Sequence, residues 1–426
     1  MRKLDNSRTI QGLVGVVDVG TTQVCCLIAA PDAAGGQTLL GLGHQRSQGI
    51  KSGMVVDTSE AERAVRAAVG QAERMAGVAL DSIVLAVACG RLKSSGFVAR
   101  AMVEGRVEGA VEGGVVRAAD IDRVIAGGEA YVERGNGRCL IQLTRSDWQL
   151  DSVKGVRDPR GLAGRELSVQ LTAITADEAP VRNLVGVIER CHLAVEGLVA
   201  TPFASAIAVA TPEERRAGVL IVDIGAGVTS LAVFADGRFV HADAIPVGGQ
   251  HITYDIARAL AAPVAEAERI KTLYGTLVKA ASDAAEFISY PGTGEDDQGG
   301  FQTSKARLRE IIEPRVEHVF SLVEERLAGA GLVGFASGGV ILTGGGSQLL
   351  GLDRVWMRRF GGTVRIGRPK PIGRMPPSMC SPAFATVVGL AVGEVGQGSA
   401  VGAVRRTPMG SPGYLGRMRQ WIGESF

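Results

Sequence analysis

The chain has 426 residues, too many for one hydrophobic core, so about two to four domains are expected. Its composition is globular, with 46% hydrophobic and 21% charged residues, and the net charge of +2 predicts no nucleic-acid partner. No apolar run of about 18 residues occurs, and no apolar segment follows the N-terminal charges. We therefore expect neither a membrane span nor a secretory signal.

The cysteines and histidines give no sign of a metal site. Six cysteines and five histidines are scattered without the spacing of metal ligands. Adjacent Cys25 and Cys26 fall in a predicted strand, so their side chains should point to opposite faces. We expect free, buried thiols, as in a cytosolic protein.

The first strongly patterned stretch is VGVVDVGTT, residues 14–22, where apolar β-formers lead into an Asp, a Gly and two Thr. This pattern predicts a buried strand that ends in a tight turn. Further strands are predicted over 22–30, 39–44 and 82–88. The strand that ends in the Asp-Gly turn and the strand over 22–30 would form a hairpin. Residues 59–76 predict a helix, since apolar residues recur there every three or four positions.

The pattern then changes and later returns. Residues of about 90–165 contain short broken strands, a helix near 120–134 and Gly-rich stretches, which indicates a small inserted domain. A strand over 166–175 and a helix over 179–191 resume the earlier style. Residues 219–227, VLIVDIGAG, repeat the strand, Asp and Gly turn about half a chain after the first. Two such turns predict two related halves that face each other across a cleft.

The remaining elements complete the second half. They begin with a helix over 203–210, strands over 228–247 with a hairpin turn at Asp236–Gly237, and helices over 253–260 and 265–273. A polar loop at 291–300 and a long helix over 308–327, interrupted by Pro314, follow. The last is a strand over 340–343, followed by three glycines and then by a helix that opens with Ser347 and Gln348.

The two Asp-Gly turns have a physical reason to bind phosphate. Small residues let backbone N–H groups approach an anion closely, and Thr hydroxyls add donors. A carboxylate at a strand end suits hydrated Mg²⁺, so Asp18 and Asp223 are predicted to bind the ion through water. The alternative is an ordinary hairpin turn at each place. The predicted phosphate-binding residues are Asp18, Gly20, Thr21, Thr22, Asp223, Gly225, Ala226, Gly227 and Thr229.

A second set of residues suits a nucleoside. Glycines at 344–346 allow close packing of a flat ring or sugar against the backbone. Glu268 and Lys271 lie at i and i+3 on one helix face, where they either contact a ribose or adenine edge or form a plain surface ion pair. The predicted nucleoside-binding residues are Gly248, Gly249, Glu268, Lys271, Gly344, Gly345, Gly346 and Gln348.

Together and in this order, these motifs resemble the actin/Hsp70/sugar-kinase ATPase superfamily, and most closely its FtsA family of bacterial cell-division proteins. The resemblance covers roughly residues 13–395. It is carried by SIVLAVACG, VIERCHLAVEGLVATPFASA, VLIVDIGAG, IPVGGQHITYDIARAL, EAERIKTLYG, EIIEPRVEHVFSLVEERL and VILTGGGSQLLGLD. It implies an α/β, actin-like two-lobed ATPase fold with an FtsA-type inserted subdomain and a C-terminal amphipathic helix, and ATP or ADP with Mg²⁺ as ligands.

The resemblance also implies a division of the chain. The expected parts are a first lobe (13–89 and 166–198), the inserted subdomain (90–165), a second lobe (199–244 and 306–395), its small subdomain (245–305), a flexible linker (396–412) and an amphipathic membrane-targeting helix (413–426).

Two departures from the family pattern concern catalysis. The second phosphate motif usually reads D-x-G-G-G-T, but here Ala226 replaces a Gly, and Val228 stands where a Thr is expected, with Thr229 one place late. Where ATPases of the superfamily often have a carboxylate before a Pro, this chain has Thr201. Because a general base must reach the attacking water, we expect nucleotide binding with weak or no hydrolysis, and no catalytic residue is assigned.

The C-terminal residues have apolar and aromatic side chains on one helix face and basic side chains on the rest, as in an interfacial membrane helix. Each Arg adds about 1 kcal/mol on anionic lipid. The alternative is a terminal helix that packs back on the domain. The predicted membrane residues are Tyr414, Leu415, Arg417, Met418, Arg419, Trp421, Ile422 and Phe426.

The resemblance implies a peripheral protein of the bacterial inner membrane that polymerises on its cytoplasmic face at the division septum, anchors the FtsZ ring and recruits later division proteins. The C-terminal peptide of FtsZ is expected on the small subdomain near Lys305, Arg307 and Arg309, which are otherwise a solvated helix face. The alternatives are a pilus-assembly actin homologue, which typically lacks the tail, and a sugar-kinase phosphotransferase, whose catalytic Asp we do not find.

Overall fold

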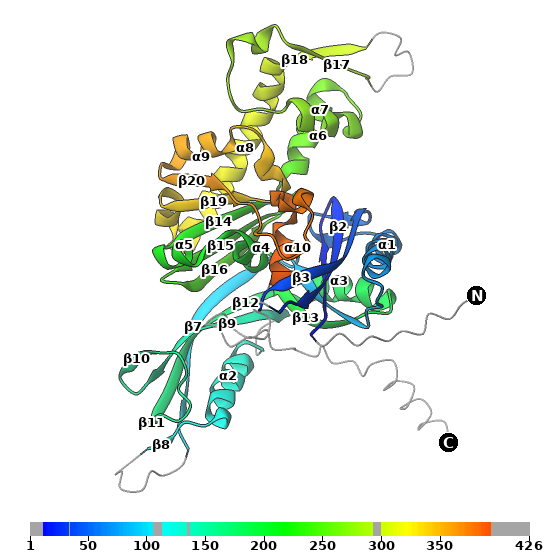
Figure 1. The fold of residues 1–426 in the computed structure, drawn as a ribbon. Helices are drawn as coiled ribbons and strands as arrows, with labels where there is room; N and C mark the ends of the chain where they lie inside the picture. The colour runs from blue at the N-terminus through cyan, green and yellow to red at the C-terminus, as the bar shows by residue number, and fades with distance from the viewer. Residues whose placement is uncertain (1–11, 34, 105–112, 134–136, 293–299, 393–426) are drawn as a thin grey trace, which may run out of the picture.

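The computed structural model describes residues 12–33, 35–104, 113–133, 137–292 and 300–392. Two five-stranded units form its centre (Figure 1). The first contains β1 (Val14–Val19), β2 (Gln23–Pro31), β3 (Gln37–Arg46), β6 (Ser82–Val87) and β13 (Ala194–Ala200). The second contains β14 (Val219–Ile224), β15 (Thr229–Ala235), β16 (Arg238–Ile245), β19 (Gly339–Thr343) and β20 (Thr363–Ile366).

The two units have the same topology. The first has the order β13-β6-β1-β2-β3 and the second the order β20-β19-β14-β15-β16. In each, the first three strands form an antiparallel meander and the last two add in parallel beside the first. The prediction of two related halves is therefore confirmed.

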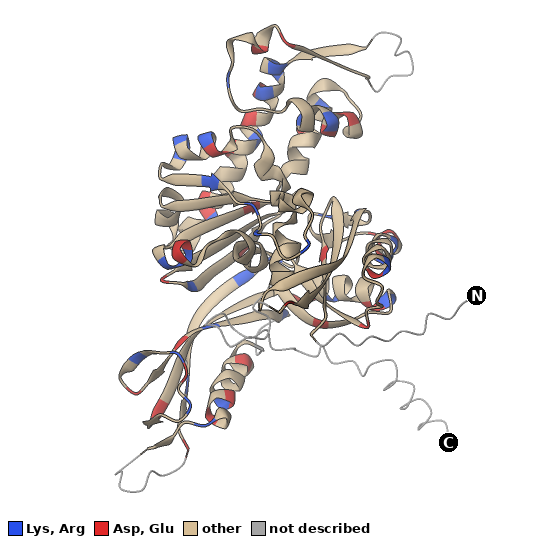
Figure 2. Cartoon of the chain, viewed as in Figure 1, with Lys and Arg blue, Asp and Glu red and all other residues tan. Residues whose placement is uncertain are grey.

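Helices cover these sheets and connect them. They are α1 (Thr58–Ala76), α3 (Glu178–Arg190), α4 (Thr201–Val209), α5 (Pro212–Ala217), α6 (Gly249–Leu260), α7 (Val264–Tyr274), α8 (Lys305–Gly329), α9 (Leu352–Phe360) and α10 (Ala385–Val392). Most of the charged residues lie on helices and loops, while the central strands are largely without them (Figure 2). No helix among the described residues is long and apolar enough to cross a membrane.

Helix α1 shows how the sequence pattern becomes packing. Its buried residues are the six predicted from the periodicity: Ala61, Ala64, Val65, Ala68, Val69 and Ala72. The Asp57 side chain caps its N-terminus by accepting from Glu60 N at 2.9 Å. Because these residues are small, α1 lies close to β3, where a Cβ at Gly41 or Gly43 would overlap backbone carbonyls of the helix.

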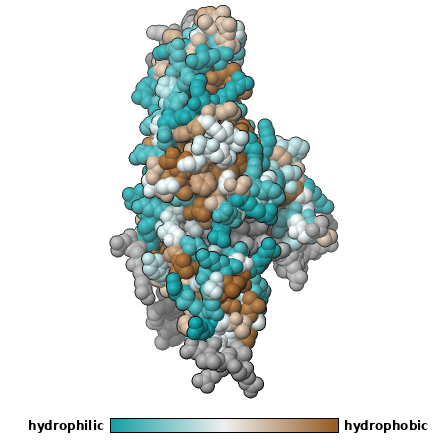
Figure 3. All heavy atoms as spheres, turned by 90° about the vertical axis from the view of Figure 1, so that its left-hand side faces the viewer, coloured by the Kyte–Doolittle hydropathy of each residue, from teal (hydrophilic) through white to brown (hydrophobic). Residues whose placement is uncertain are grey.

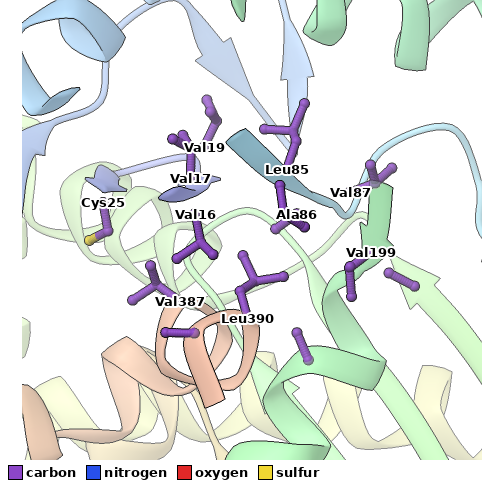
Figure 4. Packing of buried hydrophobic residues seen from close by; sticks show 14 of the residues in the cluster. Val16, Val17, Val19, Cys25, Leu85, Ala86, Val87, Val199, Val387 and Leu390 are labelled. Carbon is purple, nitrogen blue, oxygen red and sulfur yellow. The ribbon is translucent and has the colours of Figure 1, made fainter. Parts of the chain in front are cut away.

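Helices α4 and α10 pack on each other between the two sheets (Figure 1). Val387 and Leu390 of α10 lie against Val16 of β1 in the core of the first sheet (Figure 4). Residues 385–392 were predicted to be part of the second lobe. Val387 and Leu390 pack against the first sheet, whereas Thr386 reaches Asp223 of the second. This and the other predicted boundaries between parts of the chain stay predictions.

The inserted segment forms a four-stranded sheet backed by a helix. Its elements are β7 (Lys93–Met102), β8 (Gly114–Val115), α2 (Ala118–Glu133), β9 (Arg138–Leu150), β10 (Val153–Val156), β11 (Ala163–Gly164) and β12 (Glu166–Asp177). Strand β12 pairs with both β7 and β9. Through β7 this sheet continues onto β16, so nine strands run together, β10-β9-β12-β7-β16-β15-β14-β19-β20. Some apolar side chains of the inserted segment are exposed, among them Val98, Met102 and Val153. Figure 3 shows apolar residues on one face of the molecule.

Two details differ from the predictions. Helix α8 is continuous, so the prediction that Pro314 interrupts it is wrong. Pro314 lies on the exposed side of the helix, while the opposite side is buried. A buried stripe of this kind outweighs the one hydrogen bond that Pro removes. All six cysteines are free as predicted, but Cys139, Cys191 and Cys380 are only half-buried.

We predict that Gly43→Ala lowers the free energy of unfolding by about 3 kcal/mol, because the new methyl would overlap Ala68 O of α1. Gly186→Ala is the matched control, since a Cβ there meets nothing within 4 Å inside α3, and Ala should stabilise that helix by about 0.5–1 kcal/mol. Denaturant unfolding measures both. Equal stability of the two variants would contradict this account of the packing.

Candidate nucleotide-binding site

Two carboxylates lie at corresponding places in the two halves. Asp18 lies near the end of β1 and Asp223 near the end of β14, each followed by its Gly turn. Burial, and to a lesser extent the charge of Asp223, raise the pKa of Asp18 to about 7. Burial also raises the pKa of Asp223 to about 6, against hydrogen bonds from Ser205 and Thr386 that lower it. The pair therefore repel each other in a buried place, which a divalent cation would relieve.

The first turn contains free backbone donors. Gly20 N donates to Gln23 O at 2.9 Å and closes the turn. The Thr21 hydroxyl accepts from Gly53 N at 3.2 Å, and Thr22 is exposed. Neither Thr21 N nor Thr22 N donates a hydrogen bond to any other described residue. Both N–H groups are thus available to an anion.

The second turn lies directly against the first. Gly225 N donates to Val228 O at 2.9 Å, and a Cβ at Gly227 would overlap Thr21 Oγ1 of the other half. Within the described residues, Ala226 N and Gly227 N also donate no hydrogen bond. The structure therefore brings the two predicted phosphate turns together, with unpaired N–H groups on both.

Thr229 does not face this turn. Its side chain is fully buried, and its hydroxyl donates to Val247 O at 2.7 Å. The hydroxyl of Thr229, which was predicted to bind phosphate, is therefore occupied by a backbone carbonyl in the structure. The hydroxyl instead holds the backbone of the segment between β16 and α6.

Glycines build the rest of the site around the second turn. Gly249 N and Gln250 N, at the start of α6, donate to Gly225 O and Ala226 O at 2.9 and 2.8 Å. After β19, Gly344 has a φ of +80°, and a Cβ there would overlap Asp223 Oδ1. A Cβ at Gly346 would lie 2.6 Å from Ile224 Cγ2. Only glycine permits these approaches, and they form a cradle of the kind a nucleotide needs.

The segment after these glycines differs from the prediction. Gly345–Gln348 form a short 3-10 turn, η3, and the α-helix opens only at Leu352, so a helix that opens with Ser347 and Gln348 is wrong. The Gln348 side chain is exposed and accepts from Ser381 Oγ at 3.2 Å.

Lys271 and Glu268 are paired, and they also lie beside the glycines. Lys271 Nζ lies 2.7 Å from Glu268 Oε2, and it donates to Thr253 Oγ1 at 2.8 Å and to Gly249 O at 3.1 Å. The Lys side chain is 17% exposed and the Glu side chain 51%. The ion pair and a nucleoside contact are thus compatible, and the predicted contact stays a prediction.

Sequence reasoning missed the two hydroxyls that hold Asp223. Ser205 lies on α4 and is fully buried, and Thr386 Oγ1 on α10 lies 3.3 Å from Asp223 Oδ2. The TPFASA motif was a signal for the first, but nothing in the local pattern marked the second. Thr201, which stands where a carboxylate was expected, is buried with an unpartnered hydroxyl.

The basic residues predicted for a peptide lie at the start of α8, in the small subdomain with α6, α7, β17 (Phe287–Tyr290) and β18 (Phe301–Ser304). Lys305 pairs with Glu286, Arg307 with Glu310 at 3.1 Å, and Arg309 with Asp283. The Arg309 side chain is only 12% exposed, so it supports the subdomain from inside, whereas Arg307 is open to solvent.

Comparisons with solved structures define the class of fold. The PilM–PilN type IV pilus biogenesis complex matches with a TM-score of 0.61 at 16% identity, covering 89% of this chain and 97% of that one. MreB5 of Spiroplasma citri bound to ADP matches at 0.50 and 15% identity, covering 90% and 96%. The chain thus has an α/β, actin-like two-lobed fold with an inserted subdomain, as predicted.

Sequence comparisons define the family. The family model "Cell division protein FtsA" matches residues 220–389, and the model "SHS2 domain inserted in FTSA" matches residues 101–175. Cell division protein FtsA of Rhizobium meliloti is 35% identical over 97% of this chain and 95% of its own length. That of Pseudomonas aeruginosa is 31% identical over 92% and 90%. The chain belongs to the FtsA family of cell division proteins.

We predict that lowering the pH from about 8 to about 5.5 weakens Mg-ADP binding at least about tenfold, because protons compete with the cation for Asp18 and Asp223.

The raised pKa values also mean that the ligand-free protein loses stability as the pH rises from the carboxyl pKa of the unfolded chain through about 7. Calorimetric titration and thermal unfolding across this range measure both effects. An affinity that stays constant, or a stability that rises over this range and is unchanged by Asp18→Asn, would contradict the assignment.

Proposed function

We propose that this chain is an actin-like scaffold that binds ATP or ADP with Mg²⁺ and polymerises on the cytoplasmic face of the bacterial inner membrane at the division septum. There it tethers the FtsZ ring and recruits later division proteins. The observation that carries the proposal is the pair of abutting Gly turns with free N–H groups around Asp18 and Asp223, in a chain of this family. Two structures of MreB5 of Spiroplasma citri, one bound to ADP and one to AMPPNP, support the nucleotide.

The residues present fit the nucleotide and its ion. Thr21, Thr22, Ala226 and Gly227 would direct N–H groups at phosphate oxygens, and Asp18 and Asp223 would hold the water shell of Mg²⁺. The ion neutralises phosphate charge when bound. Gly344 and Gly346 would let the nucleoside approach the backbone closely.

Hydrolysis is proposed to be weak or absent. Thr201 at the start of α4 carries a hydroxyl that cannot act as a general base at neutral pH, and the second turn has lost a hydroxyl donor. The bound nucleotide would then mainly set the orientation of one lobe relative to the other.

We therefore predict that purified protein binds Mg-ATP and releases phosphate only slowly in steady state. A coupled phosphate assay alongside a binding titration measures the two separately. Vigorous phosphate release would overturn the hydrolysis proposal, and absence of binding would overturn the site itself.

Membrane attachment is proposed to reside in residues 413–426, and the linker in 396–412. Both lie outside the described residues, so the proposal depends on the sequence pattern: Tyr414, Trp421 and the other apolar residues on one face, Arg417 and Arg419 on the rest. A helix this short binds weakly alone, so stable attachment needs many copies in a polymer. The peptide of FtsZ is proposed to dock beside Arg307 and the exposed Phe287 and Phe301 of the small subdomain.

We predict that the full chain sediments with anionic vesicles in the presence of Mg-ATP and carries an FtsZ C-terminal peptide down with it. Deletion of residues 410–426 should abolish vesicle sedimentation and leave peptide binding intact, because the small subdomain is untouched. Equal sedimentation of the truncated chain would contradict the tail assignment. Family membership favours this function over pilus assembly, and failure of the peptide to bind would reopen that alternative.

A further inference from the structure

Arg138 connects the insertion to the first lobe by several hydrogen bonds. Arg138 Nη1 donates to Asp177 Oδ1 at 2.6 Å, and Nη2 donates to Arg91 O and Thr175 O at 2.9 and 2.8 Å. Its Nε donates to Thr175 Oγ1 at 3.0 Å. These partners come from the outgoing chain before β7 and the returning end of β12. One planar side chain at the start of β9 therefore joins the two passages of the chain between the first lobe and the insertion.

The insertion is also attached to the second lobe, along a narrow seam between β7 and β16. Here "the seam" means Lys93, Ser94 and Thr172 of the insertion with residues 239–243 of β16. Lys93 and Asp243 form a single antiparallel ladder pair. Ser94 Oγ accepts from Ala242 N at 2.9 Å and lies 2.9 Å from His241 Nδ1. Thr172 Oγ1 donates to Phe239 O at 3.1 Å.

A third link reaches the region between the lobes. Ala200 N donates to Gln142 Oε1 at 3.2 Å, and Gln142 belongs to β9 of the insertion. Ala200 is the residue before α4, whose Ser205 hydrogen-bonds Asp223. On the far side of the seam, Asp243 pairs with Arg326 of α8 at 3.7 Å, and α8 begins in the small subdomain.

These attachments differ in strength. Inside the insertion, β12 pairs with β7 without a break from Glu166 to Thr175, whereas the seam holds one ladder pair and a few side-chain hydrogen bonds. Helices α4 and α10 pack on each other between the lobes, and α4 also contacts β16 (Figure 1). A rotation of one lobe against the other must then either carry the insertion along or break the seam.

We propose that the seam transmits rotation of the second lobe to the insertion, so that the nucleotide in the cleft sets the orientation of the insertion on the first lobe. This inference depends on the proposed nucleotide site. Ser94 is a positioning residue in this device, because its hydroxyl serves both the backbone of Ala242 and the ring of His241.

The test compares Ser94→Ala with Ser95→Ala, a neighbouring exposed Ser in β7 that makes no seam contact among the described residues. Hydrogen exchange of the full chain is measured with and without Mg-ADP. In the unmodified protein and Ser95→Ala, the nucleotide should change exchange of β16 and of β7 and α2 at least roughly threefold. In Ser94→Ala the change in β7 and α2 should be lost, while Mg-ADP affinity stays within about twofold.

Thr172→Val is a second variant that keeps the side-chain shape but removes the bond to Phe239 O, and it should show the same loss. Its control is Thr144→Val, which removes a bond to Thr172 O inside the insertion. A full nucleotide response of the insertion in both seam variants would overturn the inference. So would a wild-type insertion that is unresponsive although Mg-ADP binds, whereas absence of Mg-ADP binding would overturn the proposed function itself.

Discussion

The close approach of three backbone segments around Asp223 is the constraint on which the site depends. Gly344 touches the carboxylate, Gly248 touches the carbonyls of the second turn, and Gly227 touches Thr21 across the lobes. A side chain at any of these places would separate elements that come from distant parts of the sequence. Gly344 and Gly248 therefore let the segments of the second lobe close around Asp223, and Gly227 lets the two phosphate turns meet across the lobes. A pair of aspartates with pKa values of about 7 and about 6 is stable there only when protons or a cation balance it.

Local pattern predicted the elements well where burial has a simple period. The stripe of α1, the β1–β2 hairpin and the Asp236–Gly237 turn all agree with the structure, because each depends on neighbours in sequence. It failed where tertiary packing overrides propensity. Pro314 stays within α8 because the helix is held on its other side, and Thr229 turns inward because Val247 O needs a donor. The triple glycine was rightly placed after a strand, yet its 3-10 turn has no clear sequence signal.

Long-range polar contacts were beyond sequence reasoning altogether. Nothing near Arg138 or Gln142 indicates that one joins the insertion to the first lobe and the other reaches the start of α4. Thr386 likewise meets Asp223 from 163 residues away. Such contacts are set by which strand edges and helices the fold brings together, and a single sequence shows no trace of those pairings. The turn motifs and the family resemblance predicted the site residues, but neither predicted the residues that support them.

The same supports explain why an actin-like cleft suits a scaffold. Asp223 is held by hydroxyls from α4 and α10, the two helices that lie between the lobes. A change of charge at this carboxylate therefore acts on the elements that connect the lobes, and through Ala200 and the seam it acts on the insertion. Under the proposed function, Thr201 in place of the expected carboxylate would let a nucleotide stay bound without turnover. The proposed slow hydrolysis and the proposed coupling of the insertion would then share one structural origin, the helices α4 and α10 that hold Asp223.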